Sequence, residues 1–239
     1  MSEPATSADS EQRSDAPRVP EFVDWIAGAL IALSGGALAV GGSALAFLLN
    51  REALEAGVES GEITVVVVER ELTEAEALDV TDAVVSWTGW GLLVTGAALL
   101  LFAVGYVVVR HRAHARTPEG ESAVSFRSAA VLGAVTAGVL SFVPLSPVLG
   151  GGLAGYLEHS RAGRAVGVGA LSGFLAMAPA LLVLAFVTVG LYAGLAAVGA
   201  ASVGVVAAAA MLFAFLFTAA FGTGLGALGG FAGGRLADR

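Results

Sequence analysis

The sequence predicts an all-α fold: a polytopic transmembrane helical bundle of about six membrane helices, two of them short and joined in a hairpin broken by proline. Of its 239 residues, 56% are hydrophobic and only 13% are charged, whereas about a quarter of the residues of a soluble domain carry charge. Several apolar runs exceed the roughly 20 residues that cross a bilayer as a helix. Most of the chain is therefore expected in lipid.

The chain opens with a polar segment followed by its first apolar run. Residues 1–20 are rich in Ser, Pro, Asp and Glu and predict a disordered cytoplasmic tail. Residues 22–49 contain one early acid, Asp24, and a tryptophan suited to an interface, Trp25. At about 1.5 Å per residue this run exceeds the ~30 Å hydrocarbon layer. Because its leader is acidic rather than basic, we expect the segment to be retained and not cleaved as a signal peptide.

A polar insertion, residues 51–86, separates the first apolar run from the second. It carries ten acids and two arginines, so its net charge of −8 equals that of the whole chain. Such a segment belongs in water, and we expect it outside the cell. Residues 73–76 (TEAE) have the form of a capping box, which predicts a helix that begins near Thr73 and continues into the second run, 87–109. Together residues 21–110 form a two-helix transmembrane module.

A short basic loop, residues 111–127, follows this module. The stretch from Arg110 to Arg127 contains four arginines, counting both end residues, and positive charge in short loops is retained in the cytoplasm. The loop and both termini are therefore predicted to be cytoplasmic. His111 and His114 have a spacing at which two imidazoles could share a metal ion on a helix, but the neighbouring arginines would repel a cation. We interpret them as part of a basic loop that sets the orientation.

The second half, residues 128–239, predicts a four-helix glycine-rich membrane domain. Pro144 and Pro147 remove two backbone donors and disfavour helical angles at the residues before them, which predicts a break. The two arms, 128–143 and 147–158, would be only ~24 and ~18 Å long as helices. Charge placement favours a hairpin that returns the chain to the cytoplasmic side, and whether its arms cross the whole bilayer stays open.

Two long apolar runs, 165–197 and 203–232, complete the bundle and meet near Gly199. The chain has 33 glycines, about twice the usual ~7%, and small residues let helices approach closely in lipid. We expect packing between helices at six of them: Gly169, Gly173, Gly222, Gly226, Gly230 and Gly234. Contact with a second copy of the chain is the alternative use of these glycines.

The hairpin region allows two interpretations. It combines the helix break with closely spaced glycines: Pro144, Pro147, Gly150, Gly151, Gly152 and Gly155. One interpretation is a compact hairpin whose glycines let its arms touch. The other is a small channel or uncoupled facilitator in which the broken helix exposes backbone polar groups to a cavity. Ion-coupled transport is disfavoured, because the interiors of the predicted helices contain no ionisable side chain.

The expected function is that of a non-enzymatic structural or interaction component of the cell membrane, with the channel as the alternative. No cysteine is present, and no motif of a known nucleophile, metal or nucleotide site stands in the required context. We therefore expect no catalytic, cofactor-binding or metal-binding residues. Membrane lipid is the expected partner, a homo-oligomer and a membrane or cell-surface protein stay open, and the acidic net charge argues against nucleic acid.

A resemblance to a known family rests on the stretch 140–158 and the glycine-rich helices after it. The residues that carry it are Phe142, Pro144, Ser146, Pro147, Gly150, Gly151, Ala154, Gly155 and Tyr156. Over residues of about 125–239 the chain resembles an uncharacterised family of small haloarchaeal membrane proteins with a domain of unknown function. The twelve basic residues are all arginine, a composition similar to that of proteins from salt-loving archaea. The resemblance implies a membrane location and provides no catalytic residues.

Overall fold

The computed structural model describes residues 18–49, 54–55, 66–67, 70–115, 122–123, 125–143, 145–158 and 162–237. The predicted tail up to residue 17, residues 50–53, 56–65 and 68–69 in and next to the acidic insertion, residues 116–121 and 124 of the basic loop, Pro144, residues 159–161 and the last two residues lie outside the described residues.

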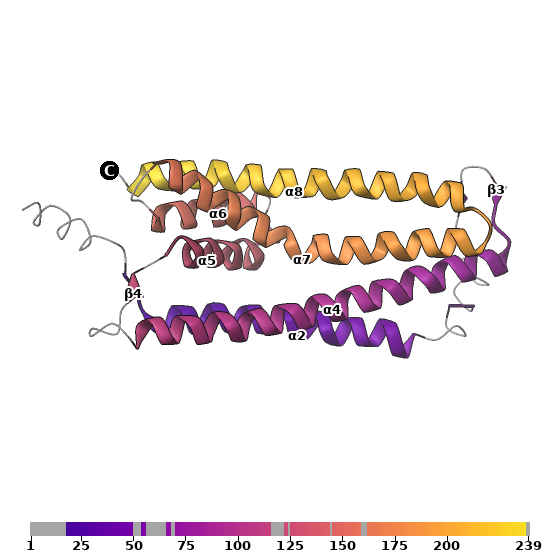
Figure 1. Cartoon of the computed structure of the whole chain (residues 1–239), viewed down its shortest axis with the longest axis horizontal. Helices are drawn as coiled ribbons and strands as arrows, with labels where there is room; N and C mark the ends of the chain where they lie inside the picture. Colours follow the sequence, from indigo (N-terminus) through magenta and orange to yellow (C-terminus); the bar gives the residue numbers. More distant parts are fainter. Residues whose placement is uncertain are drawn as a thin grey trace, which may run out of the picture. The chain divides into compact units, whose positions relative to one another are not determined.

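Six α-helices make up most of the described chain (Figure 1). They are α2 (Glu21–Ser43), α4 (Glu74–His114), α5 (Phe126–Val139), α6 (Ser146–Leu157), α7 (Ala162–Ala197) and α8 (Ala201–Ala237). A π-helical turn, η1 (Ala44–Leu48), continues α2. Four helices, namely α2 with η1, α4, α7 and α8, are long and apolar enough to cross a membrane. The predicted all-α fold with two short helices is confirmed.

Four strands of two residues each complete the described elements. They are β1 (Arg18–Val19), β2 (Val66–Val67), β3 (Arg70–Glu71) and β4 (Ser122–Ala123). β1 pairs antiparallel with β4, and β2 pairs antiparallel with β3.

Helix α4 begins at the predicted capping box. The Thr73 backbone N–H donates to Glu76 Oε2 at 3.0 Å, and the Glu76 backbone N–H donates to Thr73 Oγ1 at 3.3 Å, which satisfies donors that the first turn leaves free. The helix then continues for 41 residues to His114. The segment from Arg110 to His114 is therefore helical, and the boundary predicted between helix and loop at residue 111 is wrong. Contacts of these side chains with α2, described below, explain the longer helix.

The hairpin consists of α5 and α6, which lie side by side. α5 ends at Val139, four residues before the predicted end of the first arm. α6 begins at Ser146, after a left-handed Leu145 with φ 70°, and carries Pro147 in its first turn, where a missing N–H costs nothing. With 14 and 12 residues, the helices measure about 21 and 18 Å, so both are shorter than the hydrocarbon layer is thick.

A tight turn at Gly199 joins α7 to α8, as predicted. Gly199 has φ +75°, a left-handed conformation that costs glycine little. Its N–H donates to the Ala196 carbonyl at 3.2 Å, and the Ala200 N–H donates to the Leu195 carbonyl at 2.8 Å. These two bonds form a Schellman motif, which satisfies the last carbonyls of α7.

The chain divides into two compact units, and each long helix contributes to both. Unit 1 comprises Met1–Ile31, Ala103–Met177 and Ala219–Arg239, and unit 2 comprises Ala32–Phe102 and Ala178–Thr218. The buried core of unit 1 contains Ala129, Ala130, Ala154 and Val168, against which Phe126, Leu157, Leu171 and Leu175 pack. In unit 2, Val80 of α4 and Leu195 of α7 are buried together.

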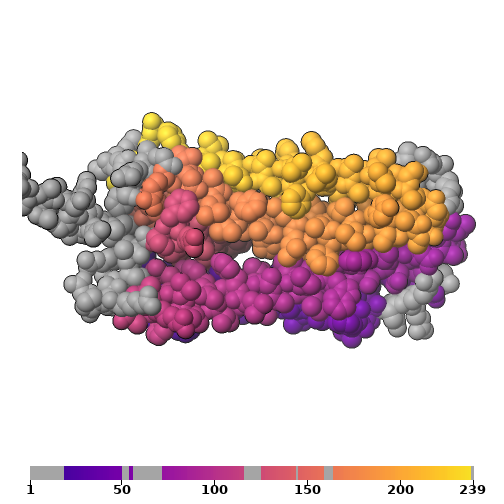
Figure 2. All heavy atoms as spheres, viewed as in Figure 1, coloured from indigo at the N-terminus to yellow at the C-terminus, as the bar shows by residue number. Residues whose placement is uncertain are grey.

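Large apolar side chains cover the outside of the helices. α8, orange to yellow in Figure 2, exposes many of them along its length: Leu212, Phe213, Leu216, Phe217, Phe221, Leu228 and Leu236. Contiguous apolar surface on this scale is unfavourable in water. Together with the four long apolar helices, it indicates a membrane protein.

Candidate functional site

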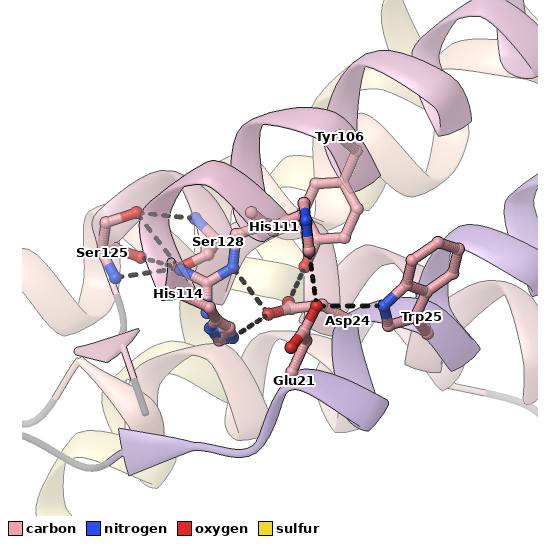
Figure 3. Close-up of polar contacts among 9 residues, drawn as sticks. Glu21, Asp24, Trp25, Tyr106, His111, His114, Ser125 and Ser128 are labelled. Carbon is pink, nitrogen blue, oxygen red and sulfur yellow. Dashed lines mark hydrogen bonds and ion pairs between the residues drawn. The ribbon is translucent and has the colours of Figure 1, made fainter. Parts of the chain in front are cut away.

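A group of charged and polar side chains is buried where α2 begins and α4 ends, within unit 1. The exposed fractions are 2% for Asp24, 6% for Arg110 and 2% for His114. Figure 3 shows Asp24 of α2 facing side chains of α4. Burial of charge is costly unless the charge is paired and hydrogen-bonded, so the partners of Asp24 decide what this group contributes.

Both carboxylate oxygens of Asp24 accept hydrogen bonds from α4. The Tyr106 hydroxyl donates to Oδ1 at 2.6 Å, and Arg110 Nε donates to Oδ2 at 2.8 Å. His114 Nε2 lies 3.2 Å from the same Oδ2. These three residues are spaced four apart and therefore form one stripe along α4. A single carboxylate thus joins two turns of the neighbouring helix to α2.

A second and more exposed pair extends the contact. Glu21 Oε1 lies 2.7 Å from His111 Nδ1, and it also accepts a hydrogen bond of 3.3 Å from Trp25 Nε1. The two carboxylates are three residues apart on α2, and the two histidines are three residues apart on α4, so both pairs fix the same register. Because the Glu21–His111 pair faces solvent, it contributes less than the buried pair.

Close backbone approach accompanies the charged contact. One turn beyond Asp24, a Cβ added at Gly28 would collide with the Val107 side chain. Glycine at this position lets α2 and α4 come near enough for short side chains to meet. The charged cluster, defined as Glu21, Asp24, Tyr106, Arg110, His111 and His114, therefore holds the two helices together by hydrogen bonds and by the Asp24–Arg110 ion pair. Within the described part of the chain, no group of three or more His, Asp or Glu side chains is arranged to hold a metal ion.

The glycines predicted for helix packing on α7 and α8 face one another in unit 1. A Cβ added at Gly173 would collide with the carbonyl of Gly222 and lie 3.0 Å from Gly226 Cα, and one at Gly169 would lie 2.6 Å from Gly230 Cα. The backbones of α7 and α8 are therefore in direct contact. Farther along α8, a Cβ at Gly234 would lie 2.7 Å from the Ala165 Cβ of α7.

The hairpin glycines belong to the same packed region. Gly151 and Gly155 of α6 face the backbone of α8, where an added Cβ would lie 2.8 Å from Gly226 Cα and 2.7 Å from Gly230 Cα, respectively. On the other side of α6, Gly150 faces the Gly133 carbonyl of α5.

Gly152 is less crowded than its neighbours, with 3.6 Å between an added Cβ and the Gly229 carbonyl. Pro147 is buried in the first turn of α6, and Pro144 lies outside the described residues.

The charged cluster was not predicted from the sequence. Asp24 was expected to be a single early acid of the first apolar run, and His111 and His114 were expected to be loop residues. A signal was available in the spacing of Tyr106, Arg110 and His114, which places all three on one face of a helix once that helix is continued to residue 114.

Comparison with known proteins finds a match over nearly the same residues as the predicted resemblance, which covered about 125–239. Residues 127–236 match a family of unknown function (DUF5518). The match covers the described helices α5 to α8 and leaves α2, α4 and the acidic insertion outside. No curated protein and no solved structure matches the chain. The similarity therefore identifies a related second half and assigns no activity.

Proposed function

We propose that this membrane protein is a non-enzymatic structural or interaction component of the cell membrane. The observation that carries the proposal is the contact around Gly226 of α8. Gly151 of α6 approaches this residue, as do Gly169 and Gly173 of α7. Three helices therefore meet at one backbone position, a packing that uses the glycines for close assembly.

The same contact argues against a channel along the hairpin. A path for an ion or small solute needs open space between the helices that line it. At Gly151 and Gly155 even a methyl-sized Cβ would collide with the backbone of α8. This crowding supports the compact-hairpin interpretation over a channel or facilitator that uses residues 144–156.

Charge along α4 supports a cytoplasmic location for both termini. Its first turns expose Glu74 and Asp79, and its last turn exposes Arg112. Under the positive-inside rule the carboxyl end of α4 is cytoplasmic, and the acidic insertion before it is external. The lysine-free, acidic composition of the chain further supports a haloarchaeal source.

Cysteine labelling tests this orientation, since the natural chain has no cysteine to interfere. We expect a membrane-impermeant maleimide to label Ser60→Cys in intact cells. Ala115→Cys, Ala162→Cys and Ala237→Cys should be labelled only after the cells are permeabilised. Labelling of Ala115→Cys or Ala237→Cys from outside would contradict the proposed orientation.

A flux measurement tests the structural role against conduction. Liposomes that contain the purified protein should be no more permeable to ions and small neutral solutes than liposomes without it, because the hairpin is closed by backbone contacts. Flux that depends on the protein, disappears in Gly151→Leu and persists in Gly138→Leu would establish the channel instead. Gly138 is a suitable control because no atom lies within 4 Å of an added Cβ there.

A further inference from the structure

We propose that three exposed arginines at one end of unit 1 bind the headgroups of anionic lipids. They are Arg112 at the end of α4, Arg127 at the start of α5 and Arg235 at the end of α8, and we call them the arginine rim. The inference rests on the proposed membrane location and adds the chemical class of lipid that this end recognises.

Contacts near the N-terminus bring the first three helix ends together. The Asp24–Arg110 ion pair places the carboxyl end of α4 beside the first turn of α2. Strand β1 leads into α2 and pairs with β4, which lies just before α5, with Val19 opposite Ser122. The ends that carry Arg112 and Arg127 are therefore on the same side of unit 1.

Contacts of α7 bring the remaining ends to this side. The Arg164 guanidinium lies 6.0 Å from the ring centroid of Phe126, in the first turn of α5, and Arg164 Nη2 lies 2.7 Å from Glu158 Oε1 at the end of α6. A Cβ added at Gly234 of α8 would lie 2.7 Å from Ala165 of α7. The end of α8 that carries Arg235 thus joins the same side.

Among the described residues at this end, internal pairing leaves a surplus of positive charge. Arg110 pairs with Asp24, and Arg164 pairs with Glu158. The three rim arginines are exposed, and no carboxylate in the described ranges forms an ion pair with them. Their guanidinium groups are therefore accessible to a partner outside these pairs.

Apolar side chains beside the rim favour a lipid over a soluble anion as that partner. The Arg235 guanidinium lies 4.4 Å from the centroid of the exposed Phe231 ring, an arrangement that suits a charge at the edge of an apolar surface. Phe22 and Trp25 are exposed in the first turns of α2. Guanidinium groups bind phosphate oxygens in a bidentate manner. An anionic phospholipid satisfies both features, since its chains meet the aromatic rings and its phosphate meets the arginines.

Trp25 provides a reporter for the lipids next to this end. The chain has three tryptophans, so Trp87→Phe and Trp90→Phe leave Trp25 as the only one. This protein is reconstituted in phosphatidylcholine vesicles that contain equal fractions of either dibrominated phosphatidylglycerol or dibrominated phosphatidylcholine. From the change in Trp25 quenching we expect phosphatidylglycerol to be preferred roughly fivefold or more. In the triple variant Arg112→Gln, Arg127→Gln, Arg235→Gln the preference should fall to about one, that is, no selectivity.

A matched variant separates a local site from net charge. Arg235→Gln and Arg70→Gln change the net charge equally, but Arg70 lies in β3, just before the opposite end of α4. The preference should fall in Arg235→Gln and stay unchanged in Arg70→Gln, with helix content checked by circular dichroism. An equal fall in both variants, or equal quenching by both lipids in the parent, would overturn the proposed rim. Absence of quenching by either lipid would instead contradict the membrane location itself.

Discussion

Replacing Asp24 by alanine is expected to lower the free energy of unfolding by about 3–5 kcal/mol. The change leaves the charge of the buried Arg110 guanidinium uncompensated and removes the acceptor of the Tyr106 hydroxyl. The cost comes mainly from the stranded charge, because a buried ion needs a partner far more than a solvated one does. Unfolding by SDS in mixed micelles, followed by circular dichroism, measures the effect.

Glu21→Ala is the matched control, since it removes a carboxylate from the same helix one turn earlier. Its pair with His111 is exposed, so the expected loss is below about 1 kcal/mol. Equal losses of unfolding free energy in the two variants would show that the buried Asp24 pair stabilises the protein no more than the exposed Glu21 pair does. A double-mutant cycle with Asp24→Asn and Arg110→Gln should give a coupling energy on the order of 2 kcal/mol.

Gly226→Leu is expected to destabilise the protein by about 3 kcal/mol, near the upper end of the usual cost of overpacking. A Cβ at this position would collide with the Gly169 carbonyl and lie 2.9 Å from Gly173 Cα. Backbone atoms cannot move aside as a flexible side chain can, so α7 and α8 would have to separate. The same SDS titration measures the loss.

Gly224→Leu provides the control on the same helix. No atom lies within 4 Å of a Cβ added at Gly224, and leucine favours a helix by up to about 1 kcal/mol relative to glycine. We expect the stability of this variant to be unchanged or slightly higher. A large loss at Gly224, or none at Gly226, would refute the assignment of the packed face.

The helices and their ends were largely predictable because local chemistry determines them. The four long helices were predicted from the lengths of the apolar runs. The start of α4 was predicted from the TEAE segment, and the turn between α7 and α8 from Gly199. The break before Pro147 followed from the missing backbone donor, although α5 ends four residues earlier than predicted. Each of these features depends on residues close together in the sequence.

The charged cluster was not predicted because its members lie far apart in the sequence. Asp24 and Arg110 are separated by 86 residues. A charged residue at the end of an apolar run usually marks the point where the chain leaves the lipid and enters water. A helix that ends at Arg110 does not include His114, which lies on the same face as Tyr106 and Arg110. In the structure, Arg110 and His114 both contact Asp24 on the helical continuation of α4.

Glycine content predicted close packing but could not identify the partners. On α2, a Cβ at Gly35 would lie 2.8 Å from the Gly96 carbonyl of α4, whereas one at the adjacent Gly36 meets open space. Neighbouring glycines of identical chemistry therefore differ completely in their surroundings. The insertion of α6 against Gly226 depends on the three-dimensional path of the hairpin, which composition alone does not encode.

The unbroken length of α4 also determines how far its acidic end stands from the lipid. A helix of 41 residues is about 60 Å long, roughly twice the thickness of the hydrocarbon layer. With residues 87–109 in that layer, residues 74–86 extend the helix by about 20 Å, and Val80 in this part packs against Leu195 of α7. The acidic residues before Thr73 are thereby attached at the end of α4 that packs against the end of α7, and not at the end that carries Asp24 and Arg110.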